Sequence, residues 1–225
     1  IAATIFNKVN FTLMKITKAI IPTAGYGTRF LPITKTIQKE MLPILNRPFI
    51  DFIVEDCLKA GVEEIIFVIR ENDTQIRNYY SEDLYLKRYL ERMHKSEKYQ
   101  LVAGLHTKAR FHFVEQKVTH AYGTAVPVQL AKSFVENEEA FLVLMGDDFF
   151  YHQDGSSETV RMIETFTNSG AQGLVTCIDV PSDLVHKYGI AEYRERDGFR
   201  FLTNQREKPE PQTINSTLAT ISKYI

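Results

Sequence analysis

The sequence predicts an α/β domain, in which helices cover a sheet built mainly from parallel strands. Two apolar, β-branched segments, residues 18–22 and 63–70, have the composition of buried strands. Between them, residues 48–60 repeat apolar side chains at helical spacing. A strand, a helix and a strand in this order form a right-handed crossover between parallel strands. Since no internal repeat or low-complexity linker interrupts the chain, we expect one continuous domain.

The elements follow one another in an alternating order. The first strand, residues 18–22, leads directly into a glycine turn. The helix after Pro48 has one predicted apolar face and ends at Gly61, a residue suited to the position after a helix. The members of that face are Phe49, Phe52, Ile53, Cys57 and Ala60.

The later segments continue the pattern. We expect one or two surface helices over 73–98, strands at 111–116, 140–148 and 173–180, and helices at 121–134 and 158–168. Segments 189–193 and 199–202 are predicted as shorter strands typical of an insertion. The strand at 140–148, AFLVLMGDD, ends in two carboxylates.

Composition excludes several classes of protein. The chain has 225 residues, of which 44% are hydrophobic and 24% charged, and its formal net charge is −1. We therefore expect neither nucleic acid nor a membrane as a partner. Cys57 and Cys177, the two cysteines, are too few for a disulfide framework or a thiolate metal site, which favours a reducing, cytoplasmic setting.

The two ends of the sequence suggest where the domain lies. Residues 1–14 lack a basic leader, and Asn7, Lys8 and Asn10 interrupt their apolar run, so they do not resemble a signal peptide. We expect them to be an extension outside the fold, with a single domain over 15–225. The last residues, TLATISKYI, stop within a predicted strand or early helix, so we expect the C-terminal part of the domain to be missing.

The turn AGYGTRF, residues 24–30, is the first candidate site. Glycine after a strand lets backbone N–H groups approach a phosphate closely. The dinucleotide-binding fingerprint would need glycine at position 30, which is Phe30, and a P-loop would need Gly-Lys-Ser/Thr where Phe30-Leu31-Pro32 stands. Two glycines alone fit a plain tight turn equally well. Arg29, Lys35 and Lys39 nearby favour a polyphosphate site instead.

The longer segment that begins with this turn resembles the signature of a known family. AGYGTRFLPITKTIQKEMLPILNRP resembles the signature of sugar-nucleotide pyrophosphorylases, and is most similar to the bacterial UTP–glucose-1-phosphate uridylyltransferases, G-x-G-T-R-x-x-P-x-T-K-x-x-P-K-E-M-L-P. Segments 115–126, 143–148, 187–193, 206–209 and 216–225 resemble further motifs in the correct order. The resemblance implies a Rossmann-like, mixed, mostly parallel sheet flanked by helices, of the nucleotide-diphospho-sugar transferase type.

The reaction implied by the resemblance is nucleotidyl transfer. UTP and glucose 1-phosphate would give UDP-glucose and pyrophosphate with the help of Mg²⁺, by in-line attack on the α-phosphate. No covalent nucleophile is needed, and the sequence offers no Ser-His-Asp or Cys-His arrangement that suggests one. A longer form of the chain would form a homo-oligomer.

The resemblance also implies the site residues. Those that would offset phosphate charge are Arg29, Lys39 and Lys208. Those that would bind the nucleotide are Ala24, Gly25, Gly27, Thr28, Glu40, Gln116 and Gly123. Gly189 and Glu207 would hold the sugar. Asp147 would bind the metal; without the family context, it could instead cap the turn after its strand.

The chain departs from the family pattern at several positions. Gln38 replaces a proline, which we expect to loosen that loop; Thr124 stands where histidine is frequent, and Thr217 stands at an asparagine position facing the sugar. Two alternatives stay open: another nucleotidyltransferase, such as a thymidylyltransferase, and a non-catalytic nucleotide-sugar-binding module. The intact Arg29 and Lys39, with Asp147 and Lys208, favour an enzyme.

Overall fold

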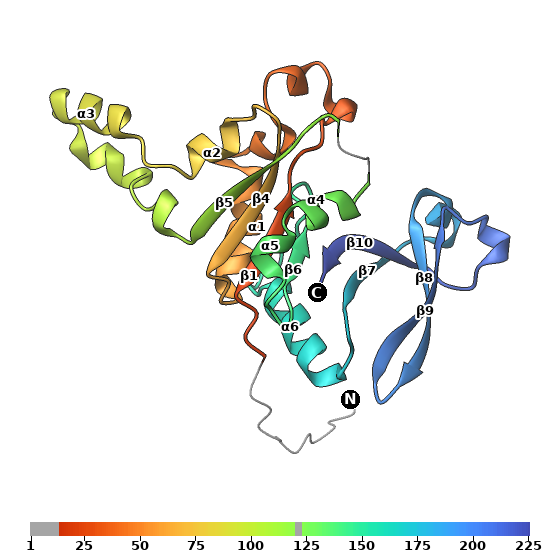
Figure 1. Cartoon of the computed structure of the whole chain (residues 1–225). Coiled ribbons are helices and arrows are strands. Elements are labelled where there is room, and N and C mark those ends of the chain that lie inside the picture. Colours follow the sequence, from red (N-terminus) through yellow and green to blue (C-terminus); the bar gives the residue numbers. More distant parts are fainter. Residues whose placement is uncertain (1–13, 120–122) are drawn as a thin grey trace.

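The computed structural model of the protein describes residues 14–119 and 123–225 (Figure 1). The strands are β1 (Lys18–Pro22), β2 (Pro43–Ile44), β3 (Arg47–Pro48), β4 (Glu64–Arg70), β5 (Arg110–Gln116), β6 (Leu142–Leu144), β7 (Val175–Asp179), β8 (Gly189–Arg196), β9 (Phe199–Glu207) and β10 (Leu218–Tyr224). The α-helices are α1 (Phe49–Lys59), α2 (Gln75–Tyr79), α3 (Leu84–Arg92), α4 (Ala125–Leu130), α5 (Lys132–Val135) and α6 (Glu158–Ser169).

Two expectations concern residues outside this description. The predicted extension covers residues 1–14; residues 1–13 lie outside the described residues, whereas Met14 packs against the main core. The predicted start of the helix at 121 also lies outside the described residues, and the helical segment that follows is divided into α4 and α5.

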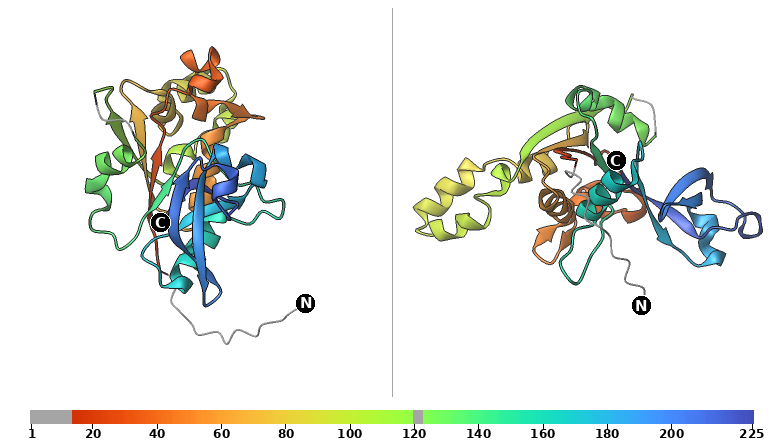
Figure 2. Two further views of the ribbon diagram at one scale, coloured as in Figure 1. Left: turned by 90° about the vertical axis from the view of Figure 1, so that its right-hand side faces the viewer. Right: turned by 90° about the horizontal axis from the view of Figure 1, so that it is seen from below.

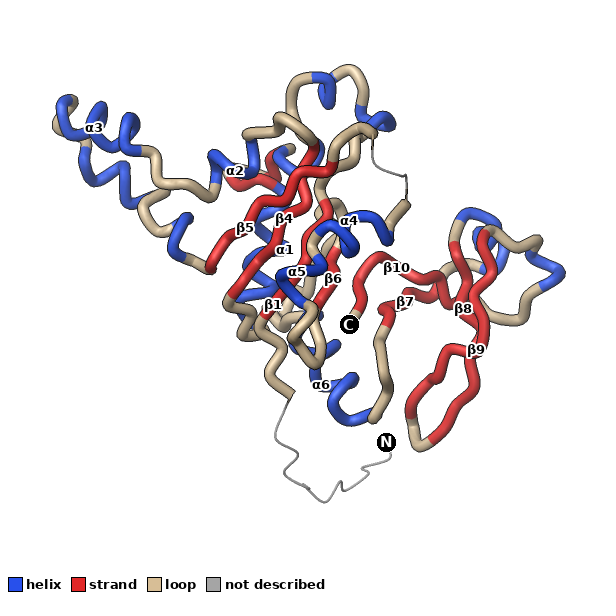
Figure 3. Tube along the Cα trace, viewed as in Figure 1, coloured by secondary structure: helices blue, strands red, loops and turns tan. Residues whose placement is uncertain are grey.

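Strands β2 and β3 pair in a separate two-stranded sheet, and the eight others form one mixed sheet, as the sequence predicts. Their order is β5-β4-β1-β6-β10-β8-β9, with β7 paired to β10 (Figure 3). Strands β5, β4, β1 and β6 are parallel, whereas β10 runs antiparallel to β6, β7 and β8. The last strand of the chain therefore lies between the parallel half of the sheet and the β8–β9 hairpin.

Helices cover both faces of the parallel half, which explains why its strands are apolar on both sides. Ile21 and Phe67 belong to a core that includes residues of α1 and α6, whereas Ile20 and Val68 belong to a second core that includes residues of α4 and α5. In Figure 2, α1 and α6 lie on one side of the parallel strands, and α4 and α5 lie on the other. Both cores hold β1 in place, so the turn that follows it starts from a rigid strand.

The buried face of α1 differs from the predicted one. Ile50, Ile53, Val54 and Cys57 are fully buried, whereas Phe49 and Phe52 are only partly buried. Phe49 still packs against the main core, and both phenylalanines contact Phe149 from the loop after β6. Periodicity correctly placed the helix, but the fully buried residues include Ile50 and Val54, which the predicted face lacks.

Two strand predictions were wrong in length. β6 is limited to Leu142–Leu144, because the chain bends away at Met145 before the two carboxylates. The β8–β9 hairpin is much longer than the expected short strands, with eight and nine residues. Asp197 and Gly198 connect its strands with φ of 53° and 79°. An Asp-Gly pair is a common two-residue hairpin turn, so the sequence did contain a signal for this pairing.

No helix in the described ranges has the length and apolar character needed to cross a bilayer.

We expect Phe67→Ala to reduce the free energy of unfolding by about 3–5 kcal/mol, measured by urea denaturation. The Phe67 ring is fully buried and stacks on Tyr80, Phe111 and Phe113. As the control, Tyr85→Ala removes a side chain that is 85% exposed, and should change stability by less than about 0.5 kcal/mol. Equal losses in both variants would contradict this core assignment.

Candidate active site

The predicted nucleotide- and metal-site residues lie at or after the carboxyl ends of β1, β5 and β6. The loop after β1 crosses the top of the sheet in Figure 1 and contains three short 3₁₀ turns, Thr28–Phe30, Ile33–Lys35 and Lys39–Met41. Gln116 ends β5, and Asp147 lies three residues beyond β6. In parallel sheets this edge is where ligands bind.

The glycine turn is closely packed against Lys39. Gly27 has φ of +62°, and its carbonyl accepts hydrogen bonds from Phe30 N at 2.9 Å and Thr34 Oγ1 at 2.8 Å. A Cβ at Gly27 would lie 3.0 Å from Thr34 Cγ2 and 3.2 Å from Lys39 Cβ. Glycine is therefore required here both by backbone conformation and by packing.

An ion pair joins this loop to the end of β6. Lys39 Nζ donates a hydrogen bond to Asp147 Oδ2, and it lies 3.6 Å from Glu40 Oε1. The Lys39 side chain is mostly buried, whereas that of Asp147 is 49% exposed. Two candidates that are 108 positions apart in sequence thus meet at one point, with the Asp147 carboxylate open to the outside.

Gln38 fixes the loop and does not loosen it, contrary to the expectation for a proline replacement. Its buried side chain donates from Nε2 to Thr23 O at 2.8 Å, and its backbone N donates to Gln75 Oε1 at 3.1 Å. Gln75 Nε2 in turn donates to Thr36 O at 3.0 Å. Gln75 belongs to α2 and was not a candidate, since nothing in the sequence relates it to the loop.

Three buried side-chain acceptors at this edge have no hydrogen-bond partner among the described residues. They are Gln38 Oε1, Glu40 Oε2 and Gln116 Oε1, and the family resemblance assigns Glu40 and Gln116 to the nucleotide. Burial raises the pKa of Glu40 to about 7, although the adjacent Lys39 opposes this shift. Because buried acceptors are normally paired, these oxygens are suited to receive hydrogen bonds from a ligand.

Gly146 allows Glu40 to approach β1. A Cβ at Gly146 would lie 2.6 Å from Thr23 Cγ2 and 3.2 Å from Glu40 Cγ. No side chain fits there without displacing the loop that carries Lys39. The motif VLMGDD contains this glycine, but sequence alone did not single it out.

The carboxylate at the end of β6 is chemically suited to a divalent cation. Asp147 already contacts one cation, the Lys39 ammonium. Within the described ranges, no three His, Cys, Asp or Glu side chains gather into a group that could hold a metal. Such a site fits Mg²⁺, which commonly uses one or two carboxylates together with substrate phosphates, and does not fit a closed structural metal site.

The predicted sugar-site residues lie on the β8–β9 hairpin. Gly189 pairs with Glu207, and a Cβ at Gly189 would lie 3.1 Å from Glu207 Oε2 and 2.9 Å from Gln205 Nε2. Lys208 Nζ lies 3.5 Å from Glu207 Oε1, and both side chains are exposed. This exposed ion pair contributes little stability, so both side chains are available to a ligand.

The remaining candidates lie on the loops, where they make few contacts. Ala24 is partly buried, whereas Thr28 and Arg29 are exposed, and Arg29 forms no ion pair with any described residue. Gly123, with φ of +138°, is exposed next to the segment 120–122, which the structure does not describe. The structure thus brings together Gly25, Gly27, Lys39, Glu40 and Asp147, and separately Gly189, Glu207 and Lys208.

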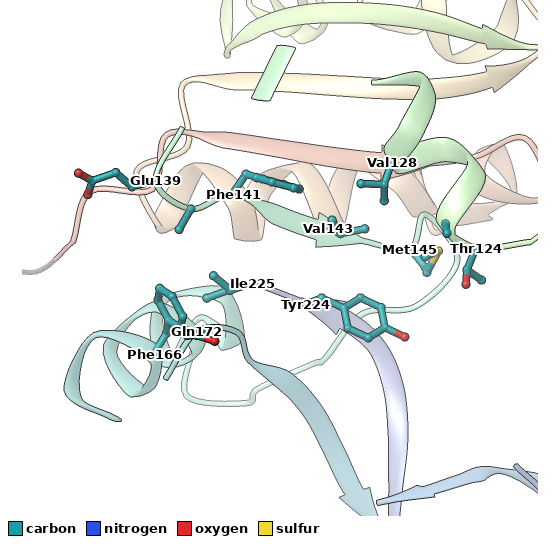
Figure 4. A pocket seen from close by; sticks show the side chains of 12 residues that line it. Thr124, Val128, Glu139, Phe141, Val143, Met145, Phe166, Gln172, Tyr224 and Ile225 are labelled. Carbon is teal, nitrogen blue, oxygen red and sulfur yellow. The ribbon is translucent and has the colours of Figure 1, made fainter. Parts of the chain in front are cut away.

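A cavity of about 460 Å³ lies between β6 and β10. Val143 and Met145 line one side, and Tyr224 and Ile225 line the other (Figure 4). Its lining is largely apolar and contains none of the predicted site residues. We therefore place the site at the glycine turn, where the charged groups and the unpaired acceptors lie.

The chain is similar to solved structures of enzymes that bind uridine nucleotides. The UTP-bound UGPase from Acinetobacter baumannii is 32% identical, with a TM-score of 0.82, and the match covers 94% of this chain and 74% of that chain. A UDP-glucose pyrophosphorylase complexed with UDP-glucose is 29% identical, with a TM-score of 0.78, over 93% of this chain and 75% of that one.

The sequence comparisons agree with the structural ones. The UTP–glucose-1-phosphate uridylyltransferase of Mycoplasma pneumoniae is 37% identical over 215 residues, covering 94% of this chain and 72% of the relative. The enzyme of the same name from Streptococcus pneumoniae is also 37% identical, over 70% of its length. Residues 18–225 match the family model described as nucleotidyl transferase. The chain therefore belongs to the nucleotidyl transferase family.

Proposed function

We propose that the protein transfers a uridylyl group from UTP to glucose 1-phosphate, giving UDP-glucose and pyrophosphate. The observation that carries this proposal is the meeting of the glycine turn, Lys39 and Asp147 at the carboxyl edge of the sheet. A relative named as this enzyme matches 94% of the chain, and the family model spans residues 18–225. A phosphate oxygen of the sugar would attack the α-phosphorus of UTP, while the bond to pyrophosphate breaks.

Charge neutralisation is the main task of this chain's own side chains. Both reactants are anions, so their approach requires cations placed before the reaction begins. Lys39 would exchange Asp147 for an α-phosphate oxygen, and Arg29, which has no ion-pair partner among the described residues, would bind the departing pyrophosphate. Lys208 would contact the phosphate of the sugar. When bound at Asp147, Mg²⁺ would offset phosphate charge and orient the triphosphate.

The base would lie beside Glu40 and Gln116. A glutamine amide can donate to a carbonyl of uracil and accept from the ring N–H, and the unpaired Gln116 Oε1 leaves this acceptor available. Backbone groups of Ala24, Gly25, Gly27 and Thr28 would surround the nucleotide, and Gly123 would let the base lie close to the main chain.

The sugar would lie against Gly189 and Glu207. The absence of a side chain at Gly189 brings the backbone near Glu207, whose carboxylate can accept from sugar hydroxyls. Thr217, which occupies the family's asparagine position, donates from Oγ1 to Asp179 Oδ1 at 2.9 Å. Glucose is the sugar of the relatives' names, and a panel of sugar phosphates would test it for this chain.

We expect pyrophosphate release with UTP, glucose 1-phosphate and Mg²⁺, and a loss of at least 100-fold in kcat for Lys39→Met or Asp147→Asn, corresponding to about 3 kcal/mol of transition-state stabilisation. Lys95→Met and Asp197→Asn are the matched controls, because both residues are exposed and lie outside the proposed site. Release from another nucleotide and sugar phosphate, or unchanged rates in the site variants, would contradict the proposal.

The pKa of Glu40 predicts how stability depends on pH. Burial raises the pKa of its carboxyl from an ordinary 4.5 to about 7, so the folded state favours the protonated form. The resulting stabilisation is complete below pH 4.5 and is lost as the pH rises through 7.

We therefore expect the stability of the wild type relative to Glu40→Gln to fall by about 2–3 kcal/mol between pH 5 and 8, measured by urea denaturation without ligand. Glu97→Gln, at an exposed position, is the control and should show no such change. A difference that stays constant or grows with pH would contradict the burial of Glu40.

A further inference from the structure

Tyr26 is an exposed aromatic residue at the centre of the glycine turn. It lies between Gly25 and Gly27, and it is 62% exposed although the loop around it is closely packed. The family signature leaves this position unspecified, as the x of G-x-G-T-R, so the resemblance gives Tyr26 no role. Its position beside the nucleotide turn raises the question of what the ring contacts when the site is filled.

The Tyr26 ring rests on a fixed cation. Arg70, the last residue of β4, places its Cζ atom 5.1 Å from the centroid of the ring. Arg70 Nη2 lies 3.2 Å from Oδ2 of the buried Asp73, whose Oδ1 accepts from Gln75 N at 2.9 Å. Because Gln75 also holds the loop of Gln38, one polar network supports both the guanidinium and the turn.

The same guanidinium lies beside the predicted base-reading residue. Arg70 and Gln116 are register partners in the parallel pair β4–β5, so their side chains project on the same side of the sheet. Gln116 Oε1 is buried without a partner, and the charge of Arg70 is close enough to Glu40 to oppose the rise in its pKa. An aromatic face and an unpaired amide edge therefore occur at one end of the site.

We propose that Tyr26 stacks on the base of the bound nucleotide, and that Arg70 is a positioning residue that holds the ring from its other face. Stacking on an aromatic side chain tolerates every base, since each has a π-face, whereas Gln116 would read the edge. This inference rests on the proposed nucleotide site and adds to it the contact that recognises the base as a flat ring.

The test compares a ligand with a base to one without. Calorimetric titrations with UTP and with inorganic tripolyphosphate are made on the wild type, Tyr26→Leu and Tyr26→Phe. We expect Tyr26→Leu to weaken UTP binding by about five- to 100-fold, and to change tripolyphosphate binding by less than twofold. Tyr26→Phe, which keeps the aromatic face, should bind UTP within twofold of the wild type.

Several results would overturn the inference. One is a Tyr26→Leu variant that binds UTP as the wild type does, and another is a variant that loses UTP and tripolyphosphate equally, since the turn itself would then be damaged. A wild type that binds tripolyphosphate as tightly as UTP has no base contact, and this result also contradicts the stacking.

The positioning role of Arg70 is tested by comparing its substitution in the wild type and in the Tyr26→Leu variant. Arg70→Met should weaken UTP binding without affecting tripolyphosphate, and should have no further effect in the Tyr26→Leu background. A loss of tripolyphosphate binding would instead make Arg70 a direct phosphate contact. Pyrophosphate release by the wild type is measured separately, so UTP binding with Tyr26-dependent affinity but no release would refute the proposed reaction and leave the stacking intact.

Discussion

The ion pair between Lys39 and Asp147 connects the two halves of the site. It joins the loop after β1 to the turn after β6, which is the neighbour of β1 in the sheet. The Lys39 side chain of the pair packs against the glycine turn. A mostly buried ammonium needs a partner, and a half-exposed carboxylate gives it one that a ligand can replace. The other candidates for phosphate and base contacts are arranged around this pair.

Two features of the surrounding structure keep the ion pair in place: glycines where a side chain would clash, and hydrogen bonds from side chains to the backbone of the loop. Gly27 and Gly146 leave room for Lys39 and Glu40, which no larger residue would allow. Gln38 and Gln75 then link the loop to β1 and α2 by hydrogen bonds. Since β1 is packed between two cores, this support reaches the sheet itself. Three buried acceptors are left unpaired among the described residues: Glu40 Oε2 and Gln116 Oε1, which belong to the proposed base site, and Gln38 Oε1 of the residue before Lys39.

Local patterns in the sequence predicted the order of elements, and the family resemblance supplied most of the candidate site residues. The sequence could not predict contacts made across the fold. The Gln38–Gln75 bonds depend on how α2 packs, and the ring contacts of Phe49 and Phe52 depend on Phe149, which is distant in sequence. Lys223 is another case: strand alternation places it inward, where burial lowers the pKa of its ammonium, and no motif indicates this. The role of each site residue stays a prediction.

We interpret the Lys39–Asp147 pair as a closed form of the site that a triphosphate and a divalent cation would open. A crystal structure of the protein with UTP and Mg²⁺ tests this most directly. We expect Lys39 Nζ to contact an oxygen of the α-phosphate, and the Asp147 carboxylate to bind the metal. A triphosphate bound elsewhere, with Lys39 and Asp147 still in contact, would contradict the account.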